Sequence, residues 1–276
     1  MKKLNLIQIL TAVVTILALA GCTDPEYPAA IPATSPSALR ANLQVFHFAP
    51  DAASLNVLVN NSKIGSDLSY KSAFAAYAPV VVGSAQIAAT GLSGSAIGGT
   101  LGTNPLVFRA GATNQTNFVF ANSVSYSLFV TDTLKRPKPT TAGATNLGGI
   151  QFLGPVVDNL TTPAAGNANI RFYHLAAGFA PVWVTTSTGT VLFSNRSYRA
   201  TAPSSGTAYN VFQSVTSGTY DLQVRTTGAT GAIALTIPNV RFEDGKIYTI
   251  VAGGFRSPSP GSVTKVALTV NVVLHN

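Results

Sequence analysis

Three histidines are the side chains of this chain best suited to acid–base chemistry near neutral pH. His47 and His174 occupy the same place in two similar stretches, 42–51 and 169–178, at the end of a predicted strand in each. Each would then serve a separate unit, and they could share one site only if the units packed symmetrically. We expect their ring nitrogens to tie a loop to the strand end, with a ligand contact or a pH-sensitive group as the alternative. His275 lies one residue from the C-terminus, where we expect a frayed chain end.

Nine acidic residues could act as general acids, general bases or metal ligands, but their spacing does not single out a pair. The chain has no HExxH motif, calcium-binding loop or cysteine–histidine set, so no metal site is predicted. It also lacks the Gly-x-Ser-x-Gly motif of serine hydrolases, and its glycine-rich segment 91–102 lacks the Gly-Lys-Ser/Thr ending of a phosphate-binding loop. We therefore expect a protein that is not an enzyme and holds no cofactor.

The thiol of Cys22 is the only one in the chain, and it closes the tetrapeptide Leu-Ala-Gly-Cys at 19–22. Two lysines and a mostly apolar run, 4–20, precede it, and this run is shorter than the roughly 20 apolar residues of a membrane-spanning helix. The pattern resembles the signal of bacterial lipoproteins, in which the cysteine becomes the first residue and carries diacylglycerol and an acyl chain such as palmitate. Residues 1–21 are thus predicted to be a signal peptide and Cys22 the lipid attachment site; an ordinary signal peptide is the alternative.

The segment 22–40 is rich in Pro, Ala and Ser, which predicts an extended tether between a membrane and the folded part. Asp24 and Glu26 follow the cysteine closely and resemble a surface-export signal of one Gram-negative phylum. An ordinary solvated tether is the alternative. We expect a lipid-anchored outer-membrane protein on the periplasmic face or the cell surface, and favour the surface.

Charged residues make up only 9% of the chain, against about 25% in a typical soluble protein. The formal net charge is +8, but the basic residues are scattered, with one small cluster at 135–138 that alternates with prolines. A nucleic-acid-binding surface needs a denser basic patch with aromatic side chains. No nucleic-acid partner is therefore expected.

Three pairs of similar segments recur in the same order with similar spacing, which predicts a tandem duplication of a domain-sized unit. The pairs are 42–51 with 169–178, 69–71 with 197–199, and 124–130 with 246–252. The predicted domains are 41–162 and 167–276, joined by a short linker.

Within each unit, apolar residues alternate with polar ones. Tyr220, Leu222 and Val224 form one face of a predicted strand, and 264–274 shows the same period of two. Such strands, separated by Gly, Pro, Asn and Ser, predict an all-β protein with two antiparallel β-sandwiches of immunoglobulin-like or transthyretin-like type. Alternation suits a sandwich because each strand faces the core on one side and water on the other.

The segment Val-Phe-His-Phe-Ala-Pro-Asp-Ala at 45–52, followed by an apolar strand at 55–59, resembles the start of the domain-of-unknown-function 4397 family. Segments 218–224 and 245–251 are similar to its later glycine–tyrosine motifs. Both units resemble the family, although Ala-Gly replaces Pro-Asp in the second unit and Val-Ser replaces the usual glycine before the tyrosine in the first. The resemblance implies a β-sandwich and no established activity.

These observations predict a lipid-anchored cell-envelope protein whose two non-catalytic sandwiches act as an interaction, adhesion or spacer module. Its partners would be the membrane, through the lipid, and a glycan or an envelope protein. Candidate ligand contacts are the loop 104–117 and the aromatic residues Trp183, Tyr209 and Phe255, of which Trp183 has a core position as its alternative. A carbohydrate-binding surface lipoprotein is the second hypothesis, and an envelope hydrolase, with a site assembled from distant residues, is the least favoured.

Overall fold

Short apolar runs bounded by turn residues form strands throughout the computed structural model of this chain. It describes residues 39–91, 106–108, 117–134, 136, 149–200, 208–256 and 265–276. These residues contain strands and turns and no helix, which confirms the predicted all-β sandwich fold. The predicted signal peptide, the lipid attachment site and nearly all of the tether lie outside them.

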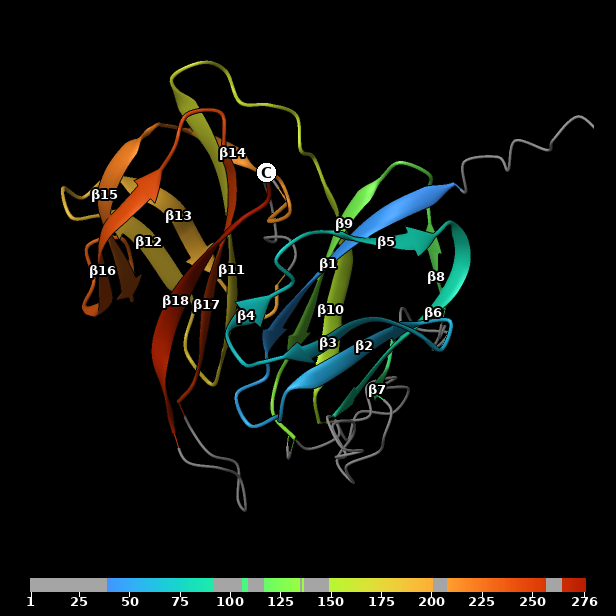
Figure 1. Ribbon diagram of the computed structural model, residues 1–276. Coiled ribbons are helices and arrows are strands. Elements are labelled where there is room, and N and C mark those ends of the chain that lie inside the picture. The colour runs from blue at the N-terminus through green and yellow to red at the C-terminus, as the bar shows by residue number, and fades with distance from the viewer. Residues whose placement is uncertain are drawn as a thin grey trace, which may run out of the picture. The chain divides into compact units, whose positions relative to one another are not determined.

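Two sheets form a sandwich in the first half of the chain, 39–158 (Figure 1). The first sheet has the order β10 (Gln151–Asp158), β9 (Ser125–Thr131), β1 (Arg40–Phe48) and β4 (Ser72–Ala73), with β5 (Ala78–Val81) also paired to β1. The second has the order β3 (Ser62–Leu68), β2 (Leu55–Val59), β6 (Gly83–Gly91) and β7 (Leu106–Val107), with β8 (Asn117–Phe120) also paired to β6. An apolar core fills the space between the two sheets.

The second half, 167–276, repeats this arrangement. One sheet has the order β14 (Gln213–Thr216), β11 (Asn167–Ala177), β17 (Ile247–Phe255) and β18 (Val266–Leu274). The other has the order β13 (Val191–Arg196), β12 (Val182–Thr186), β15 (Gly218–Thr226) and β16 (Ile233–Phe242). The strand orders of the two halves correspond, with β1, β2, β5, β6, β9 and β10 in the places of β11, β12, β14, β15, β17 and β18. Residues that occupy the same register position in corresponding strands are called equivalent.

Among the described strands, one pair in each half is parallel, which was not predicted from the sequence. β1 runs parallel to β9, and β11 runs parallel to β17, while the other pairs are antiparallel. Parallel pairs are typically buried on both faces, and these strands are: all nine residues of β17 are buried, and so are the last six of β9. Burial on both faces, rather than alternation, therefore marks the middle of both sheets.

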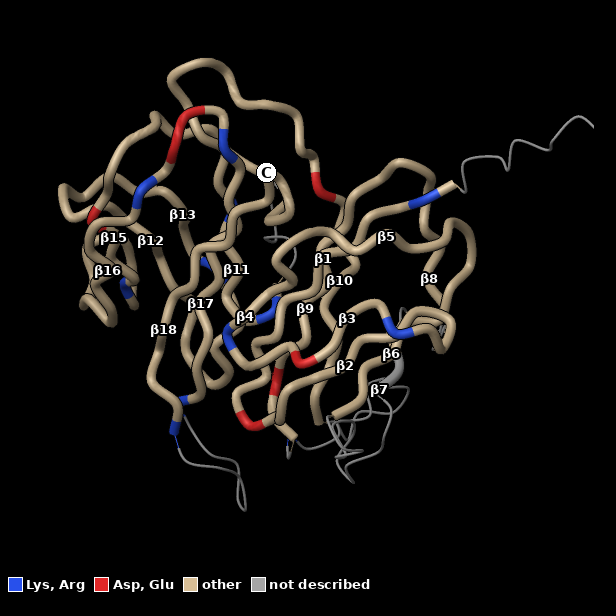
Figure 2. The backbone as a smooth tube through the Cα atoms, viewed as in Figure 1, with Lys and Arg blue, Asp and Glu red and all other residues tan. Residues whose placement is uncertain are grey.

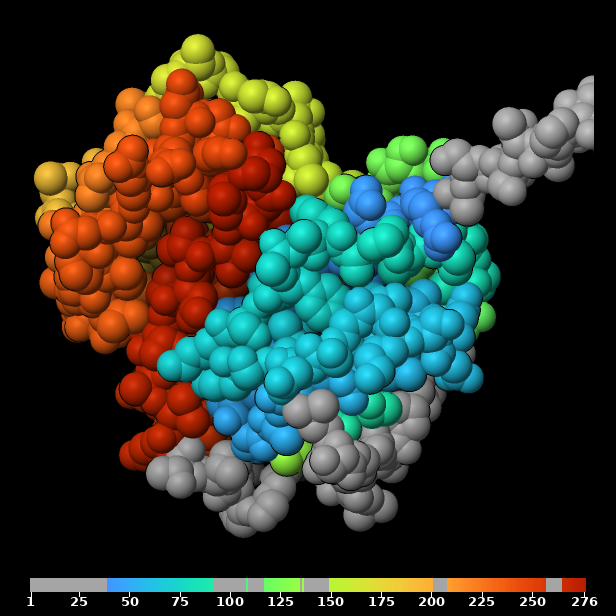
Figure 3. Space-filling view, in the orientation of Figure 1, coloured from blue at the N-terminus to red at the C-terminus, as the bar shows by residue number. Residues whose placement is uncertain are grey.

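A third apolar cluster explains this burial, because it joins the β1–β9 sheet to the β11–β17 sheet. Phe129 of the first half packs against Tyr173 of the second, with ring centroids 4.5 Å apart. Phe48 lies over Gly253, where an added Cβ would be 2.7 Å from the ring. The cluster uses equivalent positions in both halves, so the two inner sheets meet through the same face. β18 accordingly lies beside first-half residues (Figure 3), and the Asn271 amide donates to the Lys71 carbonyl at 2.8 Å.

Residues 39–276 consequently form one unit, and the part of it that the structure describes contains three apolar clusters. The two sheets that meet in the middle are called the inner sheets, and the other two the outer sheets. The exact borders predicted for two separate domains stay a prediction. Charged residues are spread thinly along the described backbone (Figure 2).

Candidate functional site

His47 ties a loop to the end of β1, as the sequence predicted. The ring is fully buried, its Nδ1 accepts a hydrogen bond from the Ala49 N–H at 3.3 Å, and Nε2 lies 3.2 Å from the Ala53 carbonyl oxygen. Because Nδ1 accepts, Nε2 carries the proton and donates. His174 makes the same two hydrogen bonds, at 3.3 and 3.2 Å, to its own loop.

A tyrosine braces each of these histidines. The ring centroids of His47 and Tyr70 are 6.2 Å apart, and those of His174 and Tyr198 are 6.1 Å apart, both in an edge-on arrangement. The backbone N–H after each tyrosine donates to the histidine carbonyl, at 2.8 and 2.9 Å. Burial lowers the pKa of each histidine from 6.5 to about 4, so both rings are neutral at pH 7. Both ring nitrogens of each histidine are therefore engaged in hydrogen bonds that hold the fold together.

His275 does not lie at a frayed end, and that prediction was wrong. Its ring contacts Tyr77 of the first half, and the following residue, Asn276, accepts a hydrogen bond from the Ile247 N–H at 2.9 Å. The chain end is held because β18 pairs with β17 along its whole length. Burial, and after it the nearby Arg171 charge, lowers the His275 pKa to about 3.

A buried ion pair between the two halves lies beside His275. Arg171 Nη1 and Asp158 Oδ1 are 2.6 Å apart without a well-aligned hydrogen bond, and neither side chain is exposed to solvent. Ser127 completes the pair: it accepts from Arg171 Nη2 at 2.7 Å and donates to Asp158 Oδ2 at 2.7 Å. The sequence pattern does not indicate this pair, because the two residues belong to different predicted domains.

With a neutral imidazole, the hydrogen bonds around this pair admit one proton arrangement. The Tyr77 hydroxyl donates to Asp158 Oδ2 at 2.6 Å, so the Tyr77 oxygen accepts from His275 Nδ1–H at 2.7 Å. His275 Nε2 then carries no proton and accepts from the Thr249 hydroxyl, whose oxygen accepts from Arg171 Nε at 2.8 Å. The result is a closed ring of polar contacts that joins the two halves; Arg171, Asp158 and Thr249 are buried in it, and Tyr77 and His275 are half-buried.

A second acid, Asp132, also joins the halves. Its Oδ2 lies 2.6 Å from Arg136 Nε and 3.1 Å from Arg199 Nη1, which belongs to the second half. Burial raises the Asp132 pKa, and the two guanidinium groups oppose that rise. In the described part of the chain, His, Asp and Glu side chains form no cluster of three or more that could hold a metal ion.

The aromatic residues proposed as ligand contacts differ in exposure. Trp183, on β12, is half-buried, whereas Tyr209 and Phe255 are only 6% and 5% exposed. The Tyr209 hydroxyl donates inward to the Asn195 carbonyl at 3.2 Å. A ligand-contact role for all three stays a prediction, and the burial of two of the rings argues against it for those two. Most of the loop 104–117, like Cys22, lies outside the described residues.

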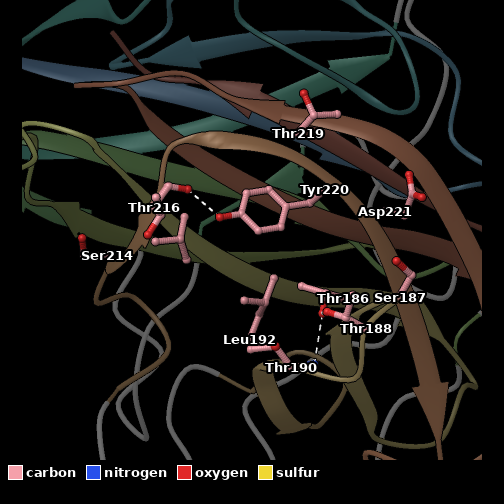
Figure 4. Close-up of a pocket in the computed structure, with 11 residues that line it drawn as sticks. Thr186, Ser187, Thr188, Thr190, Leu192, Ser214, Thr216, Thr219, Tyr220 and Asp221 are labelled. Carbon is pink, nitrogen blue, oxygen red and sulfur yellow. Dashed lines mark hydrogen bonds between the residues drawn. The ribbon is translucent and has the colours of Figure 1, made fainter.

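A groove that was not predicted from the sequence opens in the second half (Figure 4). Its volume is about 610 Å³, within the range of roughly 300–1,000 Å³ that is usual for ligand sites. The lining comes from the β12–β13 turn, from β14 and from the start of β15: Thr186, Ser187, Thr188, Thr190, Leu192, Ser214, Val215, Thr216, Thr219, Tyr220 and Asp221.

Backbone and side-chain hydrogen bonds hold the walls of this groove in place. The Tyr220 hydroxyl donates to the Thr216 carbonyl at 2.6 Å, which orients the ring across the groove (Figure 4). On the opposite wall, Thr186 Oγ1 accepts from the Thr190 N–H at 3.1 Å. The Ser187 N–H donates to the β15 carbonyl of Asp221 at 2.7 Å and so ties the turn to the neighbouring strand.

The groove could have been suspected from the run Thr-Thr-Ser-Thr-Gly-Thr at 185–190, which is unusually rich in hydroxyls. Tyr220 was predicted to share a core face with Leu222 and Val224. Leu222 and Val224 are fully buried, but Tyr220 is only half-buried because the space between the sheets opens at this end of the sandwich.

Comparison with known proteins yields one family. The model of DUF4397, a domain of unknown function, matches residues 41–185, which is more than half of the chain and agrees with the resemblance noted in the sequence. The match covers the first half, crosses the predicted domain boundary and ends within β12. No curated protein matches the chain. Among the described residues, no helix is long and apolar enough to cross a membrane.

Proposed function

The chain belongs to the DUF4397 family, a domain of unknown function, and from this premise we propose that it is a lipid-anchored protein of the cell envelope. Its two sandwiches act without catalysis, as an interaction, adhesion or spacer module. We place the protein in the outer membrane and favour the cell surface over the periplasmic face.

One observation supports a non-catalytic role above all: the side chains best suited to chemistry are used to hold the fold together. His47 and His174 each bind the backbone of their own loop, and His275 bridges Tyr77 and Thr249. The ion pair beneath His275 is buried, so its charges stabilise the joint between the inner sheets instead of facing a substrate.

The lipid anchor is proposed from the Leu-Ala-Gly-Cys tetrapeptide at 19–22 and the apolar run before it. The first strand begins at Arg40, so 17 residues lie between it and Cys22. Fully extended, such a segment reaches about 60 Å, which is enough to hold the sandwiches clear of lipid headgroups. Acyl chains contribute about 0.8 kcal/mol per buried CH₂, so several of them anchor a protein without a membrane-spanning helix.

A tandem duplication accounts for the likeness of the halves. The strand order, the parallel central pair and the two histidine ties all recur at equivalent positions. The proposed module is therefore two related sandwiches that are fixed to each other through their inner sheets.

Protease treatment of intact cells tests this proposal, with the Cys22→Ala variant beside the native chain. We expect the native protein to stay in the membrane fraction and to be cleaved on unbroken cells, and the variant to leave the membrane. Protection of the native chain until the outer membrane is opened would place the module in the periplasm instead. Retention of the Cys22→Ala variant in the membrane would contradict lipid anchoring at this cysteine.

A further inference from the structure

We propose that the groove between the β12–β13 turn, β14 and β15 binds an uncharged saccharide chain. This inference rests on the proposed interaction function and gives it a site and a ligand class. The groove is the one lined by Thr186, Tyr220 and their neighbours (Figure 4).

The chemistry of the lining favours a neutral ligand with many hydroxyls. Seven of the lining residues are Ser or Thr, whose hydroxyls both donate and accept hydrogen bonds. Among the described residues, Asp221 is the only acidic one in the lining, and no described Lys or Arg contributes to it. An anionic ligand such as a phosphate or an acidic peptide would therefore lack a positive partner. Asp221 Oδ1 accepts from the Asn239 N–H at 2.9 Å, which fixes the carboxylate at the rim.

Tyr220 adds an apolar surface among these hydroxyls. Its ring is half-buried, and its hydroxyl is bonded to Thr216, so it cannot turn freely. Leu192 and Val215 supply further apolar surface in the same lining. A sugar ring has the complementary character, because its C–H faces are apolar and its edge carries hydroxyls. A few placed polar groups around an apolar surface are typical of small-ligand sites.

The first half shows that the fold does not require these side chains. At the positions equivalent to Thr186, Ser214, Thr216 and Tyr220 it has Val59, Pro79, Val81 and Ala85. All four replacements lack a side-chain hydroxyl. Ser84 keeps a hydroxyl at the position equivalent to Thr219. The two halves have the same strand order, so the other three hydroxyls and the tyrosine are a feature of the second half and not of the sandwich itself.

A second hollow beside the groove indicates that the ligand is an oligosaccharide rather than a single sugar. It has a volume of about 330 Å³ and is lined by Ser217, Gly218, Thr219, Arg241, Phe242, Glu243 and Asp244. Thr219 lines both hollows, so they adjoin at the start of β15. Arg241 and Glu243 form an exposed ion pair here, 3.3 Å apart, and their charges offset each other. An oligosaccharide could cross from one hollow to the other.

Isothermal titration calorimetry of the full mature chain in detergent tests the inference. The probes are five neutral hexasaccharides, namely cello-, malto-, xylo-, manno- and chitohexaose, each at up to about 5 mM, which covers weak millimolar sites. We expect saturable binding of at least one. Tyr220→Ala should weaken it about tenfold or more, and Tyr220→Phe, which keeps the ring, by no more than about threefold. Thr236→Ala, on the exposed part of β16 outside both hollows, is the matched control and should bind like the native chain.

Two results would overturn the saccharide site: no binding of any hexasaccharide, or binding that Tyr220→Ala leaves unchanged while the variant keeps the native melting temperature. Different results would contradict the proposed function and not the saccharide site. Shorter sugars, detected by chromatography after incubation, would contradict the non-catalytic role while leaving the groove as their site. Membrane retention of Cys22→Ala would contradict the anchor without bearing on the groove.

Discussion

The two halves of this protein share a framework but differ in the polar residues that lie between them. The histidine ties at His47 and His174 are alike to within 0.1 Å in both hydrogen bonds. At the joint, three equivalent positions carry different residues in the two halves. The first half has Gln44, Tyr77 and Asp158 where the second half has Arg171, Phe212 and His275. The ion pair needs one member from each half, so it could not arise between two identical copies of either half. Repeated positions hold each sandwich together, and divergent positions make the two complementary.

The largest expected effect comes from breaking that complementarity. Arg171→Met should lower the free energy of unfolding by about 3–5 kcal/mol, because it leaves the Asp158 carboxylate buried without its counter-ion. Urea unfolding of the full chain measures the change. The double variant Arg171→Met with Asp158→Leu removes both charges and should be less destabilised than Arg171→Met alone. If the double variant loses as much stability as Arg171→Met or more, the two side chains are not coupled, and the proposed role of the ion pair in the joint is wrong.

The histidine ties provide the next test, because they are predicted to be equal. His47→Ala and His174→Ala should each lower the free energy of unfolding by about 2–3 kcal/mol, since each leaves a buried backbone N–H and a carbonyl without their partner. Thermal and urea unfolding would show whether the two losses agree. A loss of under about 0.5 kcal/mol for one of them would show that the two ties are not equivalent in energy.

Acid should weaken both ties together. The pKa of each histidine is about 4 in the fold and 6.5 in the unfolded chain, so the unfolded chain binds more protons between these values. Stability is therefore full above pH 6.5 and falls as the pH drops toward 4. Between pH 6 and pH 5, protonation of His47 and His174 in the unfolded chain should together lower the free energy of unfolding by about 2 kcal/mol. The His275 pKa is about 3 in the fold, so this third histidine adds about 1 kcal/mol over the same range. Urea midpoints measured across this range check the slope, and His174→Ala should reduce it by about a third.

The smallest effect is expected at the outer contacts of the joint. Arg199→Ala removes a partly exposed partner of Asp132 and should cost about 1 kcal/mol, less at high salt. Lys71 of the first half is equivalent to Arg199, and Gly254 of the second half is equivalent to Asp132. Because Gly254 offers no carboxylate, Lys71→Ala should change the free energy of unfolding by less than about 0.5 kcal/mol. Equal losses from the two variants, measured by urea unfolding at low salt, would contradict this asymmetry.

Local pattern was enough to predict several features of the structure. Alternating apolar residues and turn residues indicated the strands and the sandwich, because strand periodicity is a property of consecutive residues. The histidine ties followed from a strand end and a loop only six residues apart in each unit. The Leu-Ala-Gly-Cys signal and the tether are also read from adjacent residues, and they stay predictions.

Other features depended on contacts between residues far apart in the chain. Tyr77 and His275 are 198 residues apart, and they meet only because two sheets pack through the same face. That packing also turned the centres of both inner sheets into strands buried on two sides, with a parallel pair that alternation does not signal.

The sequence by itself therefore determined the fold class, the repeated framework and the histidine ties, because these depend on neighbouring residues and on segments that recur. Only the tertiary structure decided the joint and the groove. Arg171 finds Asp158 across the contact between halves, and Tyr220 reaches solvent because the sandwich is open at its end. The physical reason is that both depend on how sheets pack in space, and the period of a strand carries no information on which sheet will lie against it.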